Sequence, residues 1–242
     1  IDVAYLLNER KRVNTFVSCP REEYVIGQCE FLSDALPERI FSRTPFVPEC
    51  GVQERSELIL CMQAHALARR LSHADAQTAV IGVSGGLDSA LAFLVAVRAF
   101  DLLKIPRDRI IAVTMPGFGT TDRTKSNALS LMESMRATVK TVDIKSAVSI
   151  HFKDIGHDEN KFDATYENAQ ARYRTMVLMD IANESGGIVV GTGDLSELAL
   201  GWCTYNGDHM SMYSVNGSVP KTLVKSLVEF EGKRIGGAAE NI

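Results

Sequence analysis

Four short runs of apolar, mostly β-branched residues constrain the fold of this chain more than any other feature of its sequence. They are separated by longer stretches in which apolar residues recur at helical spacing. Buried strands that alternate with amphipathic helices are typical of a parallel sheet covered on both faces. We therefore predict an α/β fold, a doubly wound parallel sheet with helices on both faces. The expected strands are Ala79–Val83, Ile110–Thr114, Thr138–Val142 and Gly187–Gly191.

Helices are predicted before and between these strands, because apolar residues there recur every three to four positions. They cover about Val52–Leu71, Asp88–Leu103, Thr121–Met135 and Asn160–Glu184. Prolines interrupt the chain from Ile1 to about Pro48, so this part is expected to be irregular apart from a helix end near Tyr5–Arg12. Ligands of parallel sheets bind at the carboxyl ends of the strands. The loops at those ends are Ser84–Ser89, Met115–Thr121, Asp143–Lys145 and Gly191–Glu197.

Charge and composition exclude several classes of protein. The net charge of −4 and the pI near 5.8 argue against broad binding to nucleic acid or anionic membranes, which needs a basic surface. The longest apolar run, Ala90–Val97, is far short of the roughly 20 residues of a membrane span. Five cysteines without a C-x-x-C pair indicate reduced thiols in a cytoplasmic protein rather than disulfides or a zinc site.

A glycine-rich segment, Gly82–Ser89, joins the first expected strand to its helix. Its central glycines let the backbone approach a ligand closely. Serine hydroxyls, together with the free N–H groups and positive dipole end of the helix, add favourable groups for an anion. The segment therefore predicts a phosphate-binding loop. Its residues are Gly82, Val83, Ser84, Gly85, Gly86, Leu87, Asp88 and Ser89.

The carboxylate of Asp88 is the most informative group in this loop. A carboxylate beside phosphates is repulsive unless a cation lies between them, and Mg²⁺ takes one or two carboxylates plus phosphate oxygens. The loop lacks the Gly-Lys-Ser/Thr ending of a Walker loop and does not match G-x-G-x-x-G. The simpler alternative is a tight strand–helix turn in which Asp88 is an acidic residue at a helix N-terminus. That alternative explains each residue singly but not the set.

The run Ser84-Gly-Gly-Leu-Asp-Ser89 resembles the signature of the ATP pyrophosphatase (PP-loop) superfamily. A second block, Gly191–Asp208 with its continuation Val215–Lys221, is similar to the NAD synthetase family in its glutamine-dependent form. The stretches Glu167–Arg174 and Pro116–Thr121 fit the same family. The resemblance implies an adenine nucleotide alpha hydrolase-like fold in which the glycine-rich loop holds the phosphates of ATP.

The family resemblance, which extends roughly from Ser56 to Val228, also implies roles for individual residues. The implied catalytic residues are Asp88, Glu197, Lys221 and Asp208. Asp88 and Glu197 are the implied ligands of Mg²⁺, and Thr192 joins the loop in binding ATP. The implied contacts to deamido-NAD are Asn168, Arg172, Glu197 and Trp202.

Several of the residues in these motifs also have an ordinary structural interpretation when they are taken without the family. Glu197 fits the first turn of a helix, and Asp208 fits an Asn-Gly-Asp turn. Arg172 and Arg174 fit surface salt bridges, and a single tryptophan, Trp202, is as often part of a core as a ring that stacks on a ligand.

The resemblance implies ATP-dependent amidation of deamido-NAD to NAD. The nicotinate carboxylate would attack the α-phosphorus of ATP to give an adenylate and pyrophosphate, and ammonia would then release AMP. The competing hypotheses are another PP-loop amide ligase and a nucleotide-binding fragment without activity of its own. We expect a homodimer or larger assembly, with ATP, Mg²⁺, deamido-NAD and ammonia as partners.

Two parts of the chain are expected from the resemblance. Residues 1–51 look like the end of a glutaminase domain and its linker, and residues 52–242 like an NAD synthetase domain whose carboxyl-terminal part is incomplete. The chain begins with Ile1 rather than methionine, so a fragment is expected. No cysteine lies in a recognisable nucleophile context, so free ammonia rather than glutamine is the expected nitrogen donor.

Overall fold

The computed structural model describes residues 3–13, 42–118 and 129–236. The chain divides into two compact units, Ile1–Phe41 and Ser42–Ile242. In the first unit the described structure is one helix, α1 (Val3–Arg12), which matches the helix end expected at Tyr5–Arg12. The sheet described next belongs to the second unit.

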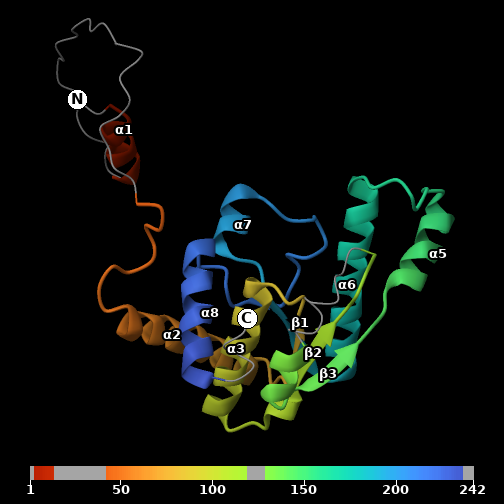
Figure 1. The fold of residues 1–242 in the computed structure, drawn as a ribbon, viewed down its shortest axis with the longest axis horizontal. Coiled ribbons are helices and arrows are strands. Elements are labelled where there is room, and N and C mark those ends of the chain that lie inside the picture. The colour runs from red at the N-terminus through yellow and green to blue at the C-terminus, as the bar shows by residue number, and fades with distance from the viewer. Residues whose placement is uncertain (1–2, 14–41, 119–128, 237–242) are drawn as a thin grey trace, which may run out of the picture. The chain divides into compact units, whose positions relative to one another are not determined.

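A five-stranded sheet in the order β3-β2-β1-β4-β5 forms the centre of the second unit, and all of its neighbouring strands are parallel (Figure 1). The four predicted strands are present within one residue of their predicted bounds, because each is rich in β-branched residues. The fifth strand is only two residues long and was not predicted. The strands are β1 (Thr78–Gly82), β2 (Ile110–Thr114), β3 (Thr138–Thr141), β4 (Gly187–Gly191) and β5 (Tyr213–Ser214).

Helices follow the strands in sequence and cover both faces of the sheet, which confirms the predicted fold class. The α-helices are α2 (Val52–His73), α3 (Leu87–Leu103), α5 (Lys145–Ile155), α6 (Ala164–Glu184), α7 (Leu195–Leu200) and α8 (Lys221–Ile235). A 3-10 turn, η2 (Arg107–Arg109), precedes β2. Residues 129–134 are helical as predicted, and the earlier part of the helix predicted for Thr121–Met135 lies outside the described residues.

Alternate residues of each central strand enter two different cores, as the two-residue period of a strand requires. In β1, Ala79 and Ile81 join the core made with α2, α3 and α8, whereas Val80 joins the core made with α6. Figure 1 shows α3 and α8 on one side of the sheet and α6 on the other. All five residues from Thr78 to Gly82 have little contact with solvent, which explains why β1 reads as a continuous apolar run.

The long helix predicted for Asn160–Glu184 begins later, at Ala164, because Asp163 caps it. The Asp163 side chain accepts hydrogen bonds from the main-chain N–H groups of Thr165 (2.9 Å) and Tyr166 (3.2 Å). This satisfies two of the donors that a helix start leaves free. Helix α5 was not predicted. Its buried residues, Val148 and Phe152, pack against Tyr166 in a small separate core.

A partly buried ion-pair network joins α2, α3 and α8. Arg98 on α3 donates to Glu231 on α8 (2.8 and 2.6 Å) and to Glu57 on α2 (both 2.7 Å). The Glu231 side chain is 1% exposed and also accepts from Arg234. Burial acts to raise the pKa of Glu231, but the hydrogen bonds from Arg234 and Arg98 outweigh it and lower the pKa to about 2.

Stability at low pH should therefore depend on Glu231. Because its pKa is lowered on folding from an ordinary value of 4.5, its contribution to the free energy of unfolding is present above about pH 4.5 and is lost as the pH falls towards 2. Urea unfolding at pH 7, 4.5 and 3 should show a midpoint that falls with pH. Glu231→Gln should flatten this dependence, whereas Glu229→Gln, at an exposed position of the same helix, should retain it. Equal pH dependence in Glu231→Gln and the unaltered chain would contradict this account.

No helix within the described residues has the length and apolar character needed to cross a bilayer. The cysteines Cys50, Cys61 and Cys203 are free. The remaining two, Cys19 and Cys29, lie outside the described residues.

Candidate active site

The order of the strands creates a point, between β1 and β4, at which the loops after these two neighbouring strands run in opposite directions. From β1 the chain passes to β2 and β3 on one side, whereas β4 and β5 lie on the other side of β1. In open parallel sheets ligands bind at such a switch point, beyond the carboxyl ends of the strands. The loops that leave this point after β1 and β4 are Val83–Gly86 and Thr192–Asp194. They correspond to two of the four loops in which the sequence predicts a ligand-binding site.

The hydroxyl groups of the glycine-rich loop after β1 form hydrogen bonds with the main chain of the same loop. Gly85 has a φ of +87°, a conformation that favours glycine, and Gly86 is the N-cap of α3. Ser89 Oγ donates to the carbonyl oxygen of Gly86 (2.9 Å), and the main-chain N–H of Gly86 is directed at Ser84 Oγ (3.3 Å). No side chain caps α3, so its dipole faces the loop. That this loop binds phosphate stays a prediction.

The loop after β4 leads into the short helix α7, whose start is a capping box. The Asp194 side chain accepts from the main-chain N–H of Glu197 (2.9 Å), and the Glu197 side chain accepts from that of Asp194 (3.2 Å). The two reciprocal bonds fix both side chains at the N-terminus of α7. Asp194 is 0% exposed.

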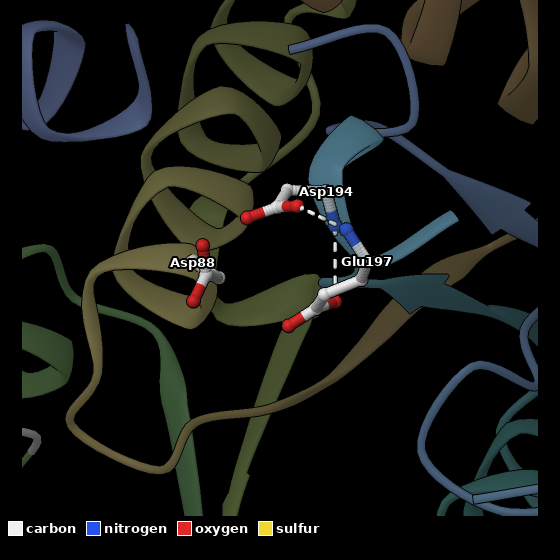
Figure 2. Close-up of side chains that lie close together, drawn as sticks. All are labelled: Asp88, Asp194 and Glu197. Carbon is white, nitrogen blue, oxygen red and sulfur yellow. Dashed lines mark hydrogen bonds between the residues drawn. The ribbon is translucent and has the colours of Figure 1, made fainter. Parts of the chain in front are cut away.

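Asp194 and Glu197 face Asp88, the second residue of α3, across the switch point. Carboxylate oxygens of the three residues lie within 4.8 Å of one another, and Figure 2 shows the three side chains converging on a common space. We call these three residues the acidic cluster. The predicted pair of Asp88 and Glu197 is therefore brought together. Asp194 was not predicted, although the Asp-x-x-Glu spacing of a capping box was present in the sequence.

Lys221, the first residue of α8, places its ammonium group among these carboxylates. Its Nζ lies 2.5 Å from Asp88 Oδ2, 3.2 Å from Asp194 Oδ2 and 3.9 Å from Glu197 Oε1. The predicted catalytic lysine thus meets the acidic cluster directly. The acidic cluster already accommodates one positive charge at its centre.

The pKa values of the site reflect this crowding of charges. Burial raises the pKa of Glu197 above its ordinary value, and the nearby charges of Asp194 and Asp88 act in the same direction. Burial acts to lower the pKa of Lys221, but the hydrogen bond and charge of Asp88 outweigh it and raise that pKa. A carboxylate held at close range to like charges has an unfavourable energy that a bound cation relieves.

The donor set fits a hard divalent cation such as Mg²⁺. Such ions prefer oxygen ligands and take one or two carboxylates together with phosphate oxygens. Asp88 Oδ1 is buried and has no hydrogen-bond partner among the described residues, so one carboxylate oxygen is available without breaking any contact. The part of the glycine-rich loop that would receive the phosphates, Val83–Gly86, ends two residues before Asp88.

A pocket of about 380 Å³ lies beside the acidic cluster at the same edge of the sheet. It is lined mainly by apolar side chains, together with the polar groups of Ser84, Thr192, Arg174 and Asp208. An apolar pocket with a few convergent polar groups is the usual setting of a small-molecule site. Its remaining lining residues are Gly82, Val83, Val113, Thr114, Met115, Ala171, Thr175, Leu178, Val189, Val190, Gly191 and Met210.

The residues predicted to contact deamido-NAD are more scattered. Asn168 Oδ1 accepts from Thr204 Oγ1 (2.9 Å), and Arg172 Nε donates to the carbonyl oxygen of Tyr205 (3.1 Å). Both therefore position the loop that follows α7. Trp202 is 80% exposed. Among them only Glu197 belongs to the acidic cluster, and none lines the pocket.

Comparison with known proteins identifies the family of this chain. Residues 60–233 match the family described as NAD synthase. The glutamine-dependent NAD(+) synthetase of Mycobacterium leprae is 42% identical over 95% of this chain, which spans 36% of that protein. The NH(3)-dependent NAD(+) synthetase of Aeropyrum pernix is 34% identical over 69% of this chain and 57% of its own length.

A solved structure agrees with these relatives. The glutamine-dependent NAD+ synthetase of Acinetobacter baumannii, in complex with ADP, superposes with a TM-score of 0.70 at 30% identity. The match covers 76% of this chain and 34% of that one. The chain therefore spans a little over a third of the glutamine-dependent relatives named here.

Proposed function

Because the chain belongs to the NAD synthase family, we propose that it amidates deamido-NAD to NAD at the expense of ATP, with Mg²⁺ bound at the acidic cluster. The observation that carries this proposal is the acidic cluster itself. Three carboxylates and a lysine meet at the start of α3, next to the glycine-rich loop. This arrangement suits a reaction in which charge develops on a departing pyrophosphate.

In the first step the nicotinate carboxylate forms a bond to the α-phosphorus of ATP, and the bond from that phosphorus to the bridging oxygen breaks. Pyrophosphate leaves with the electron pair. Mg²⁺, when bound, would neutralise phosphate charge. Asp88, Asp194 and Glu197 would hold it, main-chain N–H groups of the glycine-rich loop would bind phosphate oxygens, and Lys221 would balance the charge of the leaving group.

In the second step ammonia attacks the carbonyl carbon of the adenylate. The carbon–oxygen bond to AMP breaks, and the amide loses one proton. Asp208 lines the pocket, and its Oδ1 accepts from the main-chain N–H of Thr204 (2.7 Å), which fixes the carboxylate. We assign to Asp208 the orientation of ammonia and the uptake of its proton. Trp202, in the loop after α7, would contact deamido-NAD, and so would Asn168 and Arg172, which hold that loop from α6.

An assay of NAD formation tests the proposal directly. The 242-residue chain should convert deamido-NAD, ATP and ammonium to NAD, AMP and pyrophosphate in a 1:1:1 ratio when Mg²⁺ is present. Parallel reactions should contain xanthosine monophosphate, the acceptor of another PP-loop amide ligase. Turnover with xanthosine monophosphate but not with deamido-NAD would overturn the assignment. Binding of ATP without release of pyrophosphate would favour a nucleotide-binding fragment.

Replacement of Lys221 by methionine should move metal binding and turnover in opposite directions. The change removes the positive charge that competes with a cation for the acidic cluster. Without nucleotide, we expect the affinity for Mn²⁺, used as a paramagnetic substitute for Mg²⁺, to rise about tenfold, which is about 1.4 kcal/mol. Turnover should fall, because the leaving pyrophosphate loses its balancing charge.

Lys225→Met supplies the matched control, since Lys225 is exposed one turn further along α8. It removes the same charge from the same helix and should leave Mn²⁺ affinity unchanged. Electron paramagnetic resonance counts free Mn²⁺ and gives both affinities. Equal Mn²⁺ affinity in Lys221→Met and the unaltered chain would show that the acidic cluster is not the metal site.

The assembly of the protein belongs to the same proposal. We propose a homodimer or a larger assembly in the cytoplasm, as the family resemblance implies. Sedimentation velocity of the chain over a range of concentrations would establish the number of copies. A single monomeric species at micromolar concentration would contradict this part of the proposal.

A further inference from the structure

Asn216 is a polar residue that the reaction above does not use, although it lies between the two sides of the acidic cluster. Its exposed fraction is 0%. It lies between β5 and α8, within the stretch Val215–Lys221. No role for this asparagine is predicted from the sequence. Burial of a side-chain amide is energetically unfavourable unless its polar atoms form hydrogen bonds. The hydrogen-bond partners of Asn216 therefore indicate its role.

The NH₂ group of Asn216 bridges two main-chain carbonyl oxygens. Its Nδ2 lies 2.9 Å from the carbonyl oxygen of Asp88 and 3.2 Å from that of Thr192. Both partners can only accept, so the amide must direct its NH₂ group towards them. Its Oδ1 accepts from Gln63 Nε2 (3.2 Å), which also donates to the carbonyl oxygen of Val215 (2.8 Å). The orientation of the Asn216 side chain is therefore fixed on both sides.

The two carbonyl groups belong to the segments that carry the acidic cluster. Asp88 is the second residue of α3 and supplies one carboxylate. Thr192 follows β4 and lies two residues before Asp194, the N-cap of α7, which with Glu197 supplies the other two. The two N–H bonds of one amide thus join the phosphate loop side of the site to the α7 side.

A neutral tie is needed here because the three carboxylates repel one another. At separations of about 4 to 5 Å, two like charges near a protein surface interact unfavourably by several kcal/mol in the absence of a cation. Lys221 relieves this repulsion only while its ammonium group stays in the cluster. The hydrogen bonds of Asn216 involve neither the lysine nor a metal ion. They therefore persist when a metal ion replaces the Lys221 ammonium group in the acidic cluster.

We propose, on the basis of the function proposed above, that Asn216 is a positioning residue for the metal and ATP. It holds the main chain of Asp88 and Thr192 at the separation at which three carboxylates share one cation. Asn216 does not itself touch the reacting groups. It acts through the two main-chain carbonyl groups, and its loss should weaken metal binding before it affects chemistry.

Gln63 offers a matched control within the same hydrogen-bonded network. It is also buried, at 8% exposed, but its bonds reach Asn216 and Val215 rather than the segments that carry the acidic cluster. Gln63→Leu should therefore lower the melting temperature without much effect on metal binding. Asn216→Leu roughly keeps the volume of the side chain and removes both N–H donors without adding a charge, so it supplies a second variant if Asn216→Ala does not fold.

The experiment compares these three variants with the unaltered full chain. Mn²⁺ affinity without nucleotide is measured by electron paramagnetic resonance, and KM for ATP and kcat are measured separately. The Asn216 variants should bind Mn²⁺ at least about tenfold more weakly, the loss typical when a residue that orients metal ligands is removed. Their KM for ATP should rise by a larger factor than kcat falls. Gln63→Leu should stay within about twofold of the unaltered chain, because the tie between the segments remains.

Amide hydrogen exchange of the ligand-free chain gives a readout that needs no metal or substrate. Exchange should quicken at the N–H groups of residues 88–92 and 194–198 in the Asn216 variants, and not in Gln63→Leu. Asn216 variants with a lowered melting temperature but unchanged exchange and unchanged Mn²⁺ affinity would overturn the proposal, as would an equal loss of affinity in Gln63→Leu. Failure of the unaltered chain to bind Mn²⁺ and ATP would instead contradict the proposed function, and the exchange rates would still decide the role of Asn216.

Discussion

Replacement of Asp88 by asparagine is expected to lower kcat/KM for NAD formation by about 10³-fold, at the upper end of the 10²–10³ found when one preorganised charge-stabilising group is lost. The carboxamide cannot supply the negative oxygen that a hard cation prefers. It also leaves Lys221 without its closest partner, at 2.5 Å. The measurement is pyrophosphate release and NAD formation at saturating Mg²⁺, with the melting temperature as a check on folding.

Asp101→Asn is the matched control for this prediction. Asp101 lies on the same helix, α3, and its carboxylate pairs with Arg107 at a distance from the acidic cluster. The same chemical change at that position should leave turnover within twofold. Near-normal turnover by Asp88→Asn at saturating Mg²⁺ would contradict the assignment of the metal site.

Replacement of Arg98 by methionine is expected to destabilise the chain by about 3–5 kcal/mol, the cost found when one partner of a buried ion pair is removed. The change leaves the carboxylate of Glu231, 1% exposed, with Arg234 as its remaining arginine partner in the network. It also frees Glu57 from the bidentate contact that joins α2 to α3. Urea unfolding at pH 7 measures the loss.

Two further variants show whether the buried charge is the cause. Lys233→Met, which breaks the exposed pair with Glu229 on the same helix, should cost no more than about 0.5 kcal/mol. The double change Arg98→Met with Glu231→Leu should recover much of the stability, because the buried carboxylate that lost one of its two arginine partners is then removed as well. A double variant as unstable as Arg98→Met alone would assign the loss to packing instead.

Strands β1, β2 and β4 could be predicted because consecutive residues in them are buried. In β1 and β4 both faces are covered, so each position needs an apolar or small side chain and the pattern is continuous. Helix α5 offered no such signal. Only Val148 and Phe152 among its eleven residues are buried, which is too short an apolar stripe to distinguish a helix from a polar loop.

The parts of the candidate site that are formed by consecutive residues could be predicted. The parts that depend on packing between elements distant in the sequence could not. The glycine-rich loop was visible because strand, turn and helix are consecutive. Asp194 could have been found as a helix cap from its spacing to Glu197, but its approach to Asp88 depends on the pairing of β1 with β4. Asn216 carries no sequence signal at all, since a buried asparagine and one in a surface turn look alike in a single sequence.

The tie made by Asn216 also has a consequence for the order in which the protein folds. It joins residues 128 positions apart, and closing a loop of that length has an entropic cost that must be met before the contact stabilises anything. A glycine-rich loop formed early, after β1, would therefore lack its partner segments until the chain beyond β5 had docked. Affinity for nucleotide should appear only in the last stage of refolding, so ATP binding would report the completion of the fold rather than the formation of its first loop.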